Sequence, residues 1–509
     1  MGGAFDWQDA PRHAMNGVFI HDLLRALPFN DPRGWAEAFY TKSPAVTILF
    51  YPPLFPFILA IFYSVFGISQ ETALLVIGIF YALLASGTYL FARRMLDPLP
   101  AFLAAACIVL APEVTTWGRQ VMLDIPMLTL IVWSSWFLFR FVDTDRWKHL
   151  IASGLLFVAA VNTKQTVVLI IPAFFWVLYA NRGISFFKES RFWLLAIACA
   201  MALFPLALMQ LKFGSHNMES VVQRPDTTIE RWSIESIGWY LTRLPEMLGM
   251  VSLVVALLGL IFFSSSIRHR PIKLESWFIV IWFLVTLTAF SLIALKETRH
   301  GILILFPLAL LIGFFFQSLA KLKKIQICAG VAFMVAAAYS GAYVDRVKAV
   351  GGYMEAAQKI SEIAPANSRV LFSGYRDGPF IFALHSLSPR PSLAVVRGDK
   401  LWFNIRIMPS FGLGEKKLSK EDMLDLFYRY GIAYFVVEKG FWNKVPVQKT
   451  FNQLMKTNDF EVVDRIPLTG RVSQSEKEII IYRNLRPIKI PPDNLTINIP
   501  AVGEKVSSQ

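Results

Sequence analysis

Apolar residues in this sequence gather into long blocks that are separated by short polar segments. Ten blocks approach the roughly twenty residues that a helix needs to cross about 30 Å of hydrocarbon. They cover residues 72–92, 98–112, 122–141, 148–163, 166–181, 191–211, 247–265, 275–295, 301–319 and 325–345. This pattern predicts a polytopic α-helical membrane protein with about ten spans.

The first 70 residues contain two shorter apolar segments. Residues 51–67 begin with three prolines within six positions and are too short for a full span, which favours an interfacial or re-entrant helix. Between residues 12 and 27 apolar side chains recur every four positions, while Asn16, Asp22 and Arg25 face away. This second pattern predicts an amphipathic helix on a membrane surface.

After residue 346 the hydropathy drops, and helix-like and strand-like segments alternate. The patterns predict helices at 353–363 and 419–429, and strands at 369–373, 392–397, 432–438, 460–467 and 477–483. Such alternation is typical of a small α/β domain. We therefore expect an outer loop with amphipathic helices (1–70), a transmembrane domain (71–345) and a soluble α/β domain (346–509).

Composition excludes an ordinary soluble enzyme. Only 17% of the residues are charged, against about 25% in soluble domains, and 55% are hydrophobic. The three cysteines, Cys107, Cys199 and Cys328, lie inside apolar blocks without the spacing of metal ligands or of a disulfide framework.

The charges indicate the orientation of the spans. Lys and Arg number 50 against 36 Asp and Glu, and every second connection is basic, at 93–94, 140–148, 182–191, 268–273 and 321–324. Because cytoplasmic loops are enriched in Lys and Arg, the alternate connections and the C-terminal domain should face outward. The net charge of +14 is therefore explained without a nucleic-acid partner. The sequence also has no nucleic-acid-binding motif.

This orientation also puts residues 1–50 outside the membrane before any span has been made. The first residues have neither the basic nor the apolar region of a signal peptide. We therefore expect a further helix upstream of Met1.

Polar residues at the outer ends of the blocks suggest chemistry on that side. They are Asp9, Asp124, Lys164, Lys296, Arg299 and His300. A carboxylate can accept the proton of an attacking hydroxyl, and a cation can hold a departing phosphate. The alternatives are structural: both aspartates precede a proline as helix caps do, and the cations could extend to lipid headgroups.

Five short motifs carry a resemblance to a known family. In order, they are Asp9-Ala-Pro-Arg-His-Ala-Met-Asn-Gly, Tyr51-Pro-Pro-Leu-Phe-Pro, Trp117-Gly-Arg-Gln-Val-Met-Leu-Asp124-Ile-Pro, Asn162-Thr-Lys164 and Arg299-His-Gly-Ile-Leu-Ile-Leu-Phe-Pro307. The chain resembles the GT-C glycosyltransferases that use polyprenyl-phosphate sugars, in the branch of protein O-mannosyltransferases and lipid A aminoarabinose transferases. The resemblance covers about residues 5–345.

The resemblance implies roles for individual residues. Asp9 would be the catalytic carboxylate in a transfer with inversion, and Asp124 the second acidic residue. Arg299, with Lys164 and Lys42, would neutralise the lipid phosphate, and His300 and Tyr51 are further candidates for that phosphate. Two departures stand out: Asp9-Ala10 replaces the usual Asp-Glu, with Asp6 nearby, and Tyr51 replaces a His or Lys.

The resemblance thus implies a membrane glycosyltransferase with a polyprenyl-phosphate-linked sugar as donor and a glycan, lipid or protein as acceptor. It favours the plasma (inner) membrane of a bacterium and leaves a eukaryotic endomembrane location open. Membrane lipids are expected partners. No cofactor is indicated, and a divalent cation stays open, although Asp9 and Asp124 alone are too few ligands to argue for one. A secondary transporter and a non-catalytic scaffold for cell-envelope glycan assembly are the alternatives. The transporter is disfavoured because the blocks hold almost no charge away from their ends.

Overall fold

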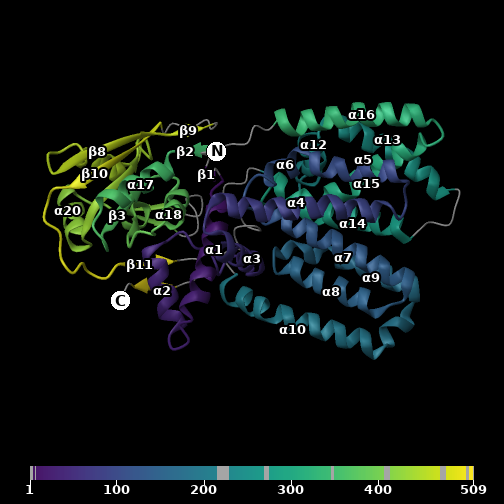
Figure 1. Cartoon of the computed structure of the whole chain (residues 1–509), viewed down its shortest axis with the longest axis horizontal. Coiled ribbons are helices and arrows are strands. Elements are labelled where there is room, and N and C mark those ends of the chain that lie inside the picture. Colours follow the sequence, from purple (N-terminus) through teal and green to yellow (C-terminus); the bar gives the residue numbers. More distant parts are fainter. Residues whose placement is uncertain are drawn as a thin grey trace. The chain divides into compact units, whose positions relative to one another are not determined.

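The computed structural model describes residues 4–5, 7–214, 229–268, 274–344, 349–405, 413–470, 477–499 and 504–507. They form two compact units (Figure 1). Unit 1 contains residues 1–49, 56–74 and 347–509, and unit 2 contains residues 50–55 and 75–346. Asp6 and part of the basic connection 268–273 lie outside the described residues.

Unit 2 is built from helices. Its α-helices are α4 (Gln70–Ala92, which begins in unit 1), α5 (Pro98–Leu110), α6 (Pro112–Trp117), α7 (Asp124–Thr144), α8 (Trp147–Val161), α9 (Ile171–Arg182), α10 (Ser190–Phe213), α12 (Ile234–Leu248), α13 (Met250–Arg268), α14 (Leu274–Ser291), α15 (Leu305–Ser318) and α16 (Lys323–Tyr339). Three short 3₁₀-helices lie between some of them: η1 (Gln165–Ile170), η2 (Ile184–Lys188) and η3 (Thr298–Ile304). The π-helix η4 (Ser340–Val344) follows α16.

Within the described ranges, seven helical segments are long and apolar enough to cross a membrane, or up to eight if the bent pair of α12 and α13 is one span. Each of the ten predicted blocks coincides with a helix, but α5 and α8 have only 13 and 15 residues. The helix α5 ends at Leu110 because the residue before Pro112 leaves the helical region, with ψ of 132°. The block 247–265 corresponds to α13, which is bent by 117° relative to α12. Of the ten predicted blocks, seven or eight thus have the length of a full span among the described residues.

Among the candidate spans of the described residues, the segment of η3 and α15 is the most enclosed. In the segment formed by η3 and α15, 78% of the apolar window is buried, against 6% in α10. Helices α5 and α13 pack along α15 (Figure 1). At Gly259 of α13, a Cβ atom would lie 1.9 Å from the carbonyl oxygen of Leu311. Only glycine permits this approach, and such small residues are typical of contacts between membrane helices.

Unit 1 contains a five-stranded mixed sheet with the order β4-β3-β7-β10-β8. The strands are β3 (Arg369–Ser373), β4 (Ala394–Arg397), β7 (Ile432–Glu438), β8 (Phe460–Pro467) and β10 (Glu478–Asn484). Strand β3 is parallel to β4 and β7, whereas β10 is antiparallel to β7 and β8.

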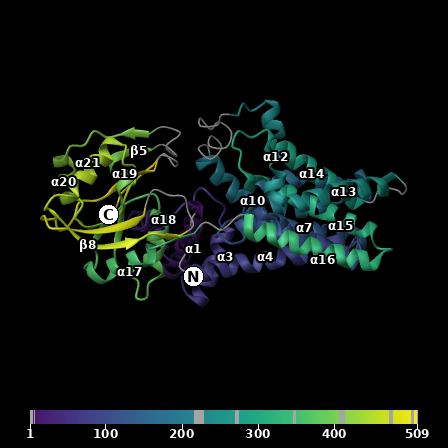
Figure 2. The ribbon, with the colours of Figure 1, turned by 90° about the horizontal axis from the view of Figure 1, so that it is seen from above.

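Helices cover both faces of this sheet: α20 (Lys420–Arg429) and α21 (Pro446–Leu454) lie on one side and α17 (Tyr353–Ile363) on the other (Figure 2). Strand residues alternate between the faces. Phe435 and Val437 of β7 join the apolar core with α20 and α21. Tyr434 and Glu438 instead form hydrogen bonds to α17. Because both faces are covered, the central strands are nearly continuous apolar runs.

The predicted elements of this domain are confirmed, with α17, β3, β7 and β8 at the predicted bounds and the other three within two residues. The sequence patterns missed α18 (Asp377–Ser386), α19 (Gly398–Trp402) and α21. Two smaller pairings, β5 (Phe403–Ile405) with β6 (Leu413–Glu415) and β11 (Thr496–Ile499) with β12 (Glu504–Ser507), complete the domain.

The N-terminal residues belong to the same unit. Strand β1 (Ala4–Phe5) pairs with β2 (Ala349–Gly351), which pairs with β9 (Thr469–Gly470). Helices α1 (Asp9–Ala26), α2 (Pro32–Lys42) and α3 (Leu54–Phe66) follow. The predicted amphipathic surface helix is corrected here. Most of α1 is buried on all sides, including Asn16, which was expected to face away and instead forms hydrogen bonds with Thr47.

We expect Gly259→Leu to destabilise unit 2 by about 1–3 kcal/mol, because the added side chain has no room beside Leu311. The matched control is Gly78→Leu on α4, where a Cβ atom meets nothing within 4 Å. The measurement is the Tm of each purified variant in detergent. A Gly259→Leu variant as stable as Gly78→Leu would contradict this packing.

Candidate active site

The short helix α6 carries a buried carboxyl group in unit 2. Glu113 is 5% exposed, and its Oε1 accepts a hydrogen bond of 2.6 Å from Trp117 Nε1. Burial raises the pKa of Glu113 to about 7, and the charge of Asp124 adds to this rise, while hydrogen bonds from Trp117 and Thr298 act against it. A carboxyl group with this pKa can gain or lose a proton near neutral pH.

Asp124 lies within electrostatic reach of Glu113 and forms an ion pair. Lys164 Nζ donates to Asp124 Oδ1 at 2.6 Å, and Asp124 is 1% exposed. Asp124 is the first residue of α7, after Leu123 in the N-cap position, and α7 has no side-chain cap. The cap alternative for Asp124 is therefore not realised. Its carboxylate lies at the positive end of the helix dipole and pairs with a cation.

The third charged group comes from η3 and the residue before it. Arg299 Nε donates to Glu297 Oε2 at 2.5 Å, and its guanidinium lies 5.8 Å from the ring centre of Trp117. His300 Nε2 is 4.0 Å from the same Glu297 oxygen, and its ring stacks on Phe290. Trp117 thus contacts both the guanidinium of Arg299 and the carboxyl of Glu113.

Two further connections border this region. Leu54 N donates to the carbonyl oxygen of Asn162, which joins the Tyr51 motif to the motif that contains Lys164. Lys296 Nζ donates to the carbonyl oxygens of Phe290 and Ser291 at the end of α14. Burial lowers the pKa of Lys296 to about 8. Its hydrogen bonds make Lys296 a cap of α14.

Two of the sequence-predicted residues lie in unit 1. Asp9 is the first residue of α1, which has Gln8 in the N-cap position and no side-chain cap, and Lys42 is the exposed last residue of α2. Asp124, Lys164, Arg299, His300 and Tyr51 lie in unit 2. Sequence reasoning missed Glu113 and Glu297 as site residues. A carboxylate directly after an apolar block was the available signal for Glu113.

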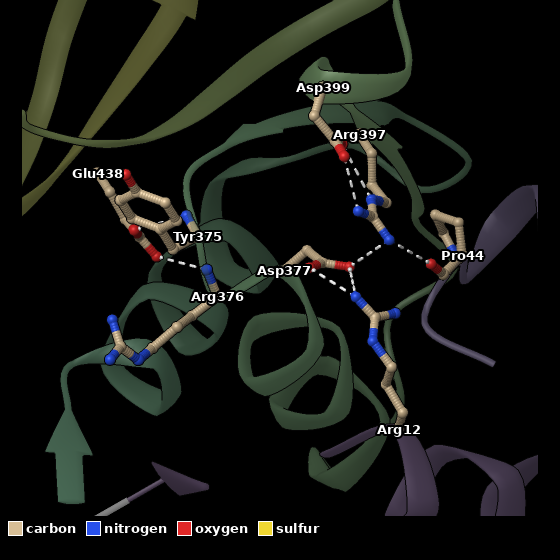
Figure 3. Close-up of polar contacts among 8 residues, drawn as sticks. All are labelled: Arg12, Pro44, Tyr375, Arg376, Asp377, Arg397, Asp399 and Glu438. Atoms are coloured by element: carbon tan, nitrogen blue, oxygen red, sulfur yellow. Dashed lines mark hydrogen bonds and ion pairs between the residues drawn. The ribbon is translucent and has the colours of Figure 1, made fainter. Parts of the chain in front are cut away.

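A buried ionic network fixes the helix that carries Asp9. Arg12 Nη2 of α1 donates to Asp377 Oδ1 of α18 at 3.2 Å (Figure 3). Arg397 Nη1 is 2.9 Å from Asp377 Oδ2, and it also donates to the carbonyl oxygen of Pro44. The other two nitrogens of the Arg397 guanidinium, Nε and Nη2, form a bidentate ion pair with Asp399. Burial alone would lower the pKa of Arg397, but Asp377 and Asp399 raise it, so the guanidinium stays charged.

A second buried carboxylate orders the start of α18. Glu438 of β7 accepts a hydrogen bond from Tyr353 Oη. It also accepts hydrogen bonds from the backbone N–H groups of Tyr375 and Arg376, the residues that lie beside it in Figure 3. These bonds hold the loop between β3 and α18, directly before Asp377. The position of Asp377, and through it that of α1, is therefore set by the sheet.

Among the described residues, no group of three or more His, Cys, Asp and Glu could hold a metal ion. The divalent cation that the sequence left open therefore finds no such group of ligands in the described part of the chain.

Residues 51–209 match the family model for dolichyl-phosphate-mannose-protein mannosyltransferases. A search of curated proteins found no match. Among solved structures, ArnT from Cupriavidus metallidurans bound to undecaprenyl phosphate is similar, with a TM-score of 0.62 and 12% identity over 94% of each chain. The Archaeoglobus fulgidus oligosaccharyltransferase has a TM-score of 0.51 and 11% identity, over 76% of this chain and 59% of that one.

The arabinofuranosyltransferase AftD from Mycobacteria has a TM-score of 0.53 and 15% identity, over 89% of this chain and 36% of AftD. These matches confirm the resemblance that the motifs predicted: the chain has the fold of GT-C glycosyltransferases, with a transmembrane helical part and a small C-terminal sheet domain.

We expect Asp377→Asn to destabilise unit 1 by about 3–5 kcal/mol, because it leaves the two arginines with one fewer buried carboxylate. The control is Asp425→Asn, which breaks a solvent-exposed pair with Arg429 and should cost less than about 1 kcal/mol. The Tm of both purified variants is the measurement. Equal values would show that the network is dispensable.

Glu113→Gln should change how stability depends on pH. The raised pKa of Glu113 means that folding binds its proton, so this contribution is present at low pH and is lost as pH rises through about 7. Between about pH 4.5 and pH 7.5, the Tm of the wild type should fall relative to that of Glu113→Gln, and the difference should level off at higher pH. The exposed Glu235→Gln should keep the wild-type profile. Parallel wild-type and Glu113→Gln profiles would contradict the assignment.

Proposed function

We propose that this chain is a membrane glycosyltransferase that moves a sugar from a polyprenyl-phosphate carrier to a hydroxyl group of a glycan, lipid or protein. The main supporting observation is that two cations from separate motifs in unit 2 are linked to the buried Glu113. Lys164 pairs with Asp124, whose charge acts on Glu113, and Arg299 lies over Trp117, which donates a hydrogen bond to Glu113. Support also comes from the ArnT structure, which contains undecaprenyl phosphate, and from the match to mannosyltransferases.

The proposed reaction breaks the bond between the anomeric carbon and the carrier phosphate. The acceptor hydroxyl attacks that carbon from the opposite face, so the configuration inverts. The polyprenyl phosphate leaves with the bonding electrons, and Arg299 and Lys164 balance its charge, with His300, Tyr51 and Lys42 as further candidate contacts. The proton of the acceptor passes to a carboxylate.

Asp9 is the proposed proton acceptor, with Asp124 as the second acidic residue. The cluster in unit 2 suggests how these roles divide: Asp124 is already paired with Lys164, which favours an orienting role for it. Glu113 is a further candidate for proton exchange, since its pKa of about 7 suits general acid and base catalysis.

The proposed location is the plasma (inner) membrane of a bacterium, with the active site and the C-terminal domain on the extracytoplasmic side. The support is the alternation of basic connections along the sequence. Accessibility of an introduced cysteine at the exposed Lys456 to a membrane-impermeant reagent in intact cells would test this orientation.

The test is turnover of polyprenyl-phosphate sugars by the purified full chain in lipid nanodiscs, followed by mass spectrometry. We expect Asp9→Asn to lower transfer at least a hundredfold while donor binding is retained, and Arg299→Ala to weaken donor binding. The matched control is Asp31→Asn, at the N-cap of α2, where asparagine is an equally good cap.

Normal turnover by Asp9→Asn would refute the assigned base. If the folded wild-type protein neither binds nor consumes any donor, the glycosyltransferase proposal is wrong, and the transporter or scaffold alternative is favoured.

A further inference from the structure

A groove of about 810 Å³ lies at the end of helix α1 in unit 1. One wall is the last turns of α1, with His21, Asp22 and Arg25. The opposite wall is the segment 385–390, at and after the end of α18. Trp35 of α2 and the end of α3 complete it. The groove contains none of the residues assigned to glycosyl transfer.

The groove holds one arginine in a fixed position. Arg390 Nη1 donates to Asp22 Oδ2 at 2.5 Å, and His21 Nδ1 lies 2.8 Å from the other oxygen of Asp22. Burial alone would raise the pKa of Asp22, but Arg390 and His21 outweigh it and lower this pKa. Asp22 therefore stays ionised and orients the guanidinium of Arg390 across the groove.

A second arginine adds positive charge that the groove itself does not balance. Arg25 lies in the last turn of α1 and, among the described residues, makes no ion pair. His385 contributes no charge, because burial and the charge of Arg390 lower its pKa to about 3. Two arginines against the single carboxylate of Asp22 leave a net positive groove, which suits an anion.

Apolar side chains are exposed at the same helix ends. At the end of α1, Leu24 and Leu27 are 47% and 52% exposed, and Phe29 just beyond is 82% exposed. At the end of α3, Val65 and Phe66 are 68% and 61% exposed. Exposed apolar residues beside arginines and a tryptophan are typical of a surface that lies in the headgroup region of a bilayer.

Arg25 also has a simpler role, since a cation in the last turn stabilises the helix dipole. That role needs no groove. It does not account for Arg390, which comes from a distant segment and is held beside α1 by Asp22. The exposed apolar side chains at the ends of α1 and α3 likewise do not contribute to stabilising the helix dipole.

We propose that this groove binds the phosphate headgroup of a lipid, with Arg25 and Arg390 as the phosphate ligands and the acyl chains lying over the exposed apolar ends of α1 and α3. Asp22 is the residue that positions Arg390. The proposal does not depend on the transfer reaction, and its test measures binding alone.

The experiment is native mass spectrometry of the full chain in a neutral detergent, titrated with dioctanoyl phosphatidic acid. We expect saturable binding that Arg25→Gln weakens about tenfold, the value of one charge-assisted hydrogen bond. Arg25→Gln breaks no ion pair among the described residues and removes only the interaction with the helix dipole, so its Tm should fall only slightly below that of the wild type. Arg390→Gln should weaken binding similarly, and the exposed Arg33→Gln on α2 is the charge-matched control, with wild-type affinity.

Two further ligands test whether the groove binds the phosphate, the acyl chains or both. Dioctanoylglycerol has the same chains without phosphate and should bind at least about tenfold more weakly. Inorganic phosphate has the same group without chains. If it binds as tightly as phosphatidic acid, the groove is a free-phosphate site and the lipid assignment is overturned. Wild-type affinity in Arg25→Gln, or equal binding of dioctanoylglycerol, would overturn the phosphate site itself.

Discussion

The carboxylate of Asp377 is the group on which the arrangement of unit 1 depends. It accepts from Arg12 at one end of the sequence and pairs with Arg397 of the sheet domain. Asp399 supplies the second negative charge, so two arginines and two aspartates balance inside the protein. Because an unpaired charge there is costly, displacing α1 along or around its axis would break this balance. The network therefore gives α1 one position on the sheet domain.

In unit 2 the described carboxylates of the cluster are also paired with cations, with the exception of Glu113. Lys164 compensates Asp124, and Arg299 compensates Glu297. Glu113 interacts instead with Trp117, Thr298 and the like charge of Asp124, and among the described residues no cation pairs with it. The ion pairs hold the geometry of the cluster. Glu113 has a pKa of about 7, so its charge can change near neutral pH.

Much of the fold was readable from the sequence, for physical reasons that also explain what was missed. The strands β3, β7 and β8 were found because apolar runs bounded by polar residues fit a sheet covered on both faces. Helix α18 was missed because eight of its ten residues are buried, so it has no polar face to give a helical period. Helix α1 was assigned to a membrane surface because the pattern could not show that α18, far along the sequence, packs against it. Among the candidate site residues, the motifs pointed to Asp124, Lys164 and Arg299. Glu113 was overlooked because its proximity to Asp124 and Thr298 exists only once α6, α7 and η3 are folded.

The pairing of β1 with β2 joins residues about 340 positions apart, and it closes unit 1 from the two ends of the sequence. At about 5–20 residues per second, a ribosome needs on the order of 20 to 70 s to synthesise the intervening chain. During that time α1 lacks α18, the helix of the sheet domain against which it packs. Biogenesis of this protein therefore includes an interval in which α1 has been made but the partner that carries Asp377 has not.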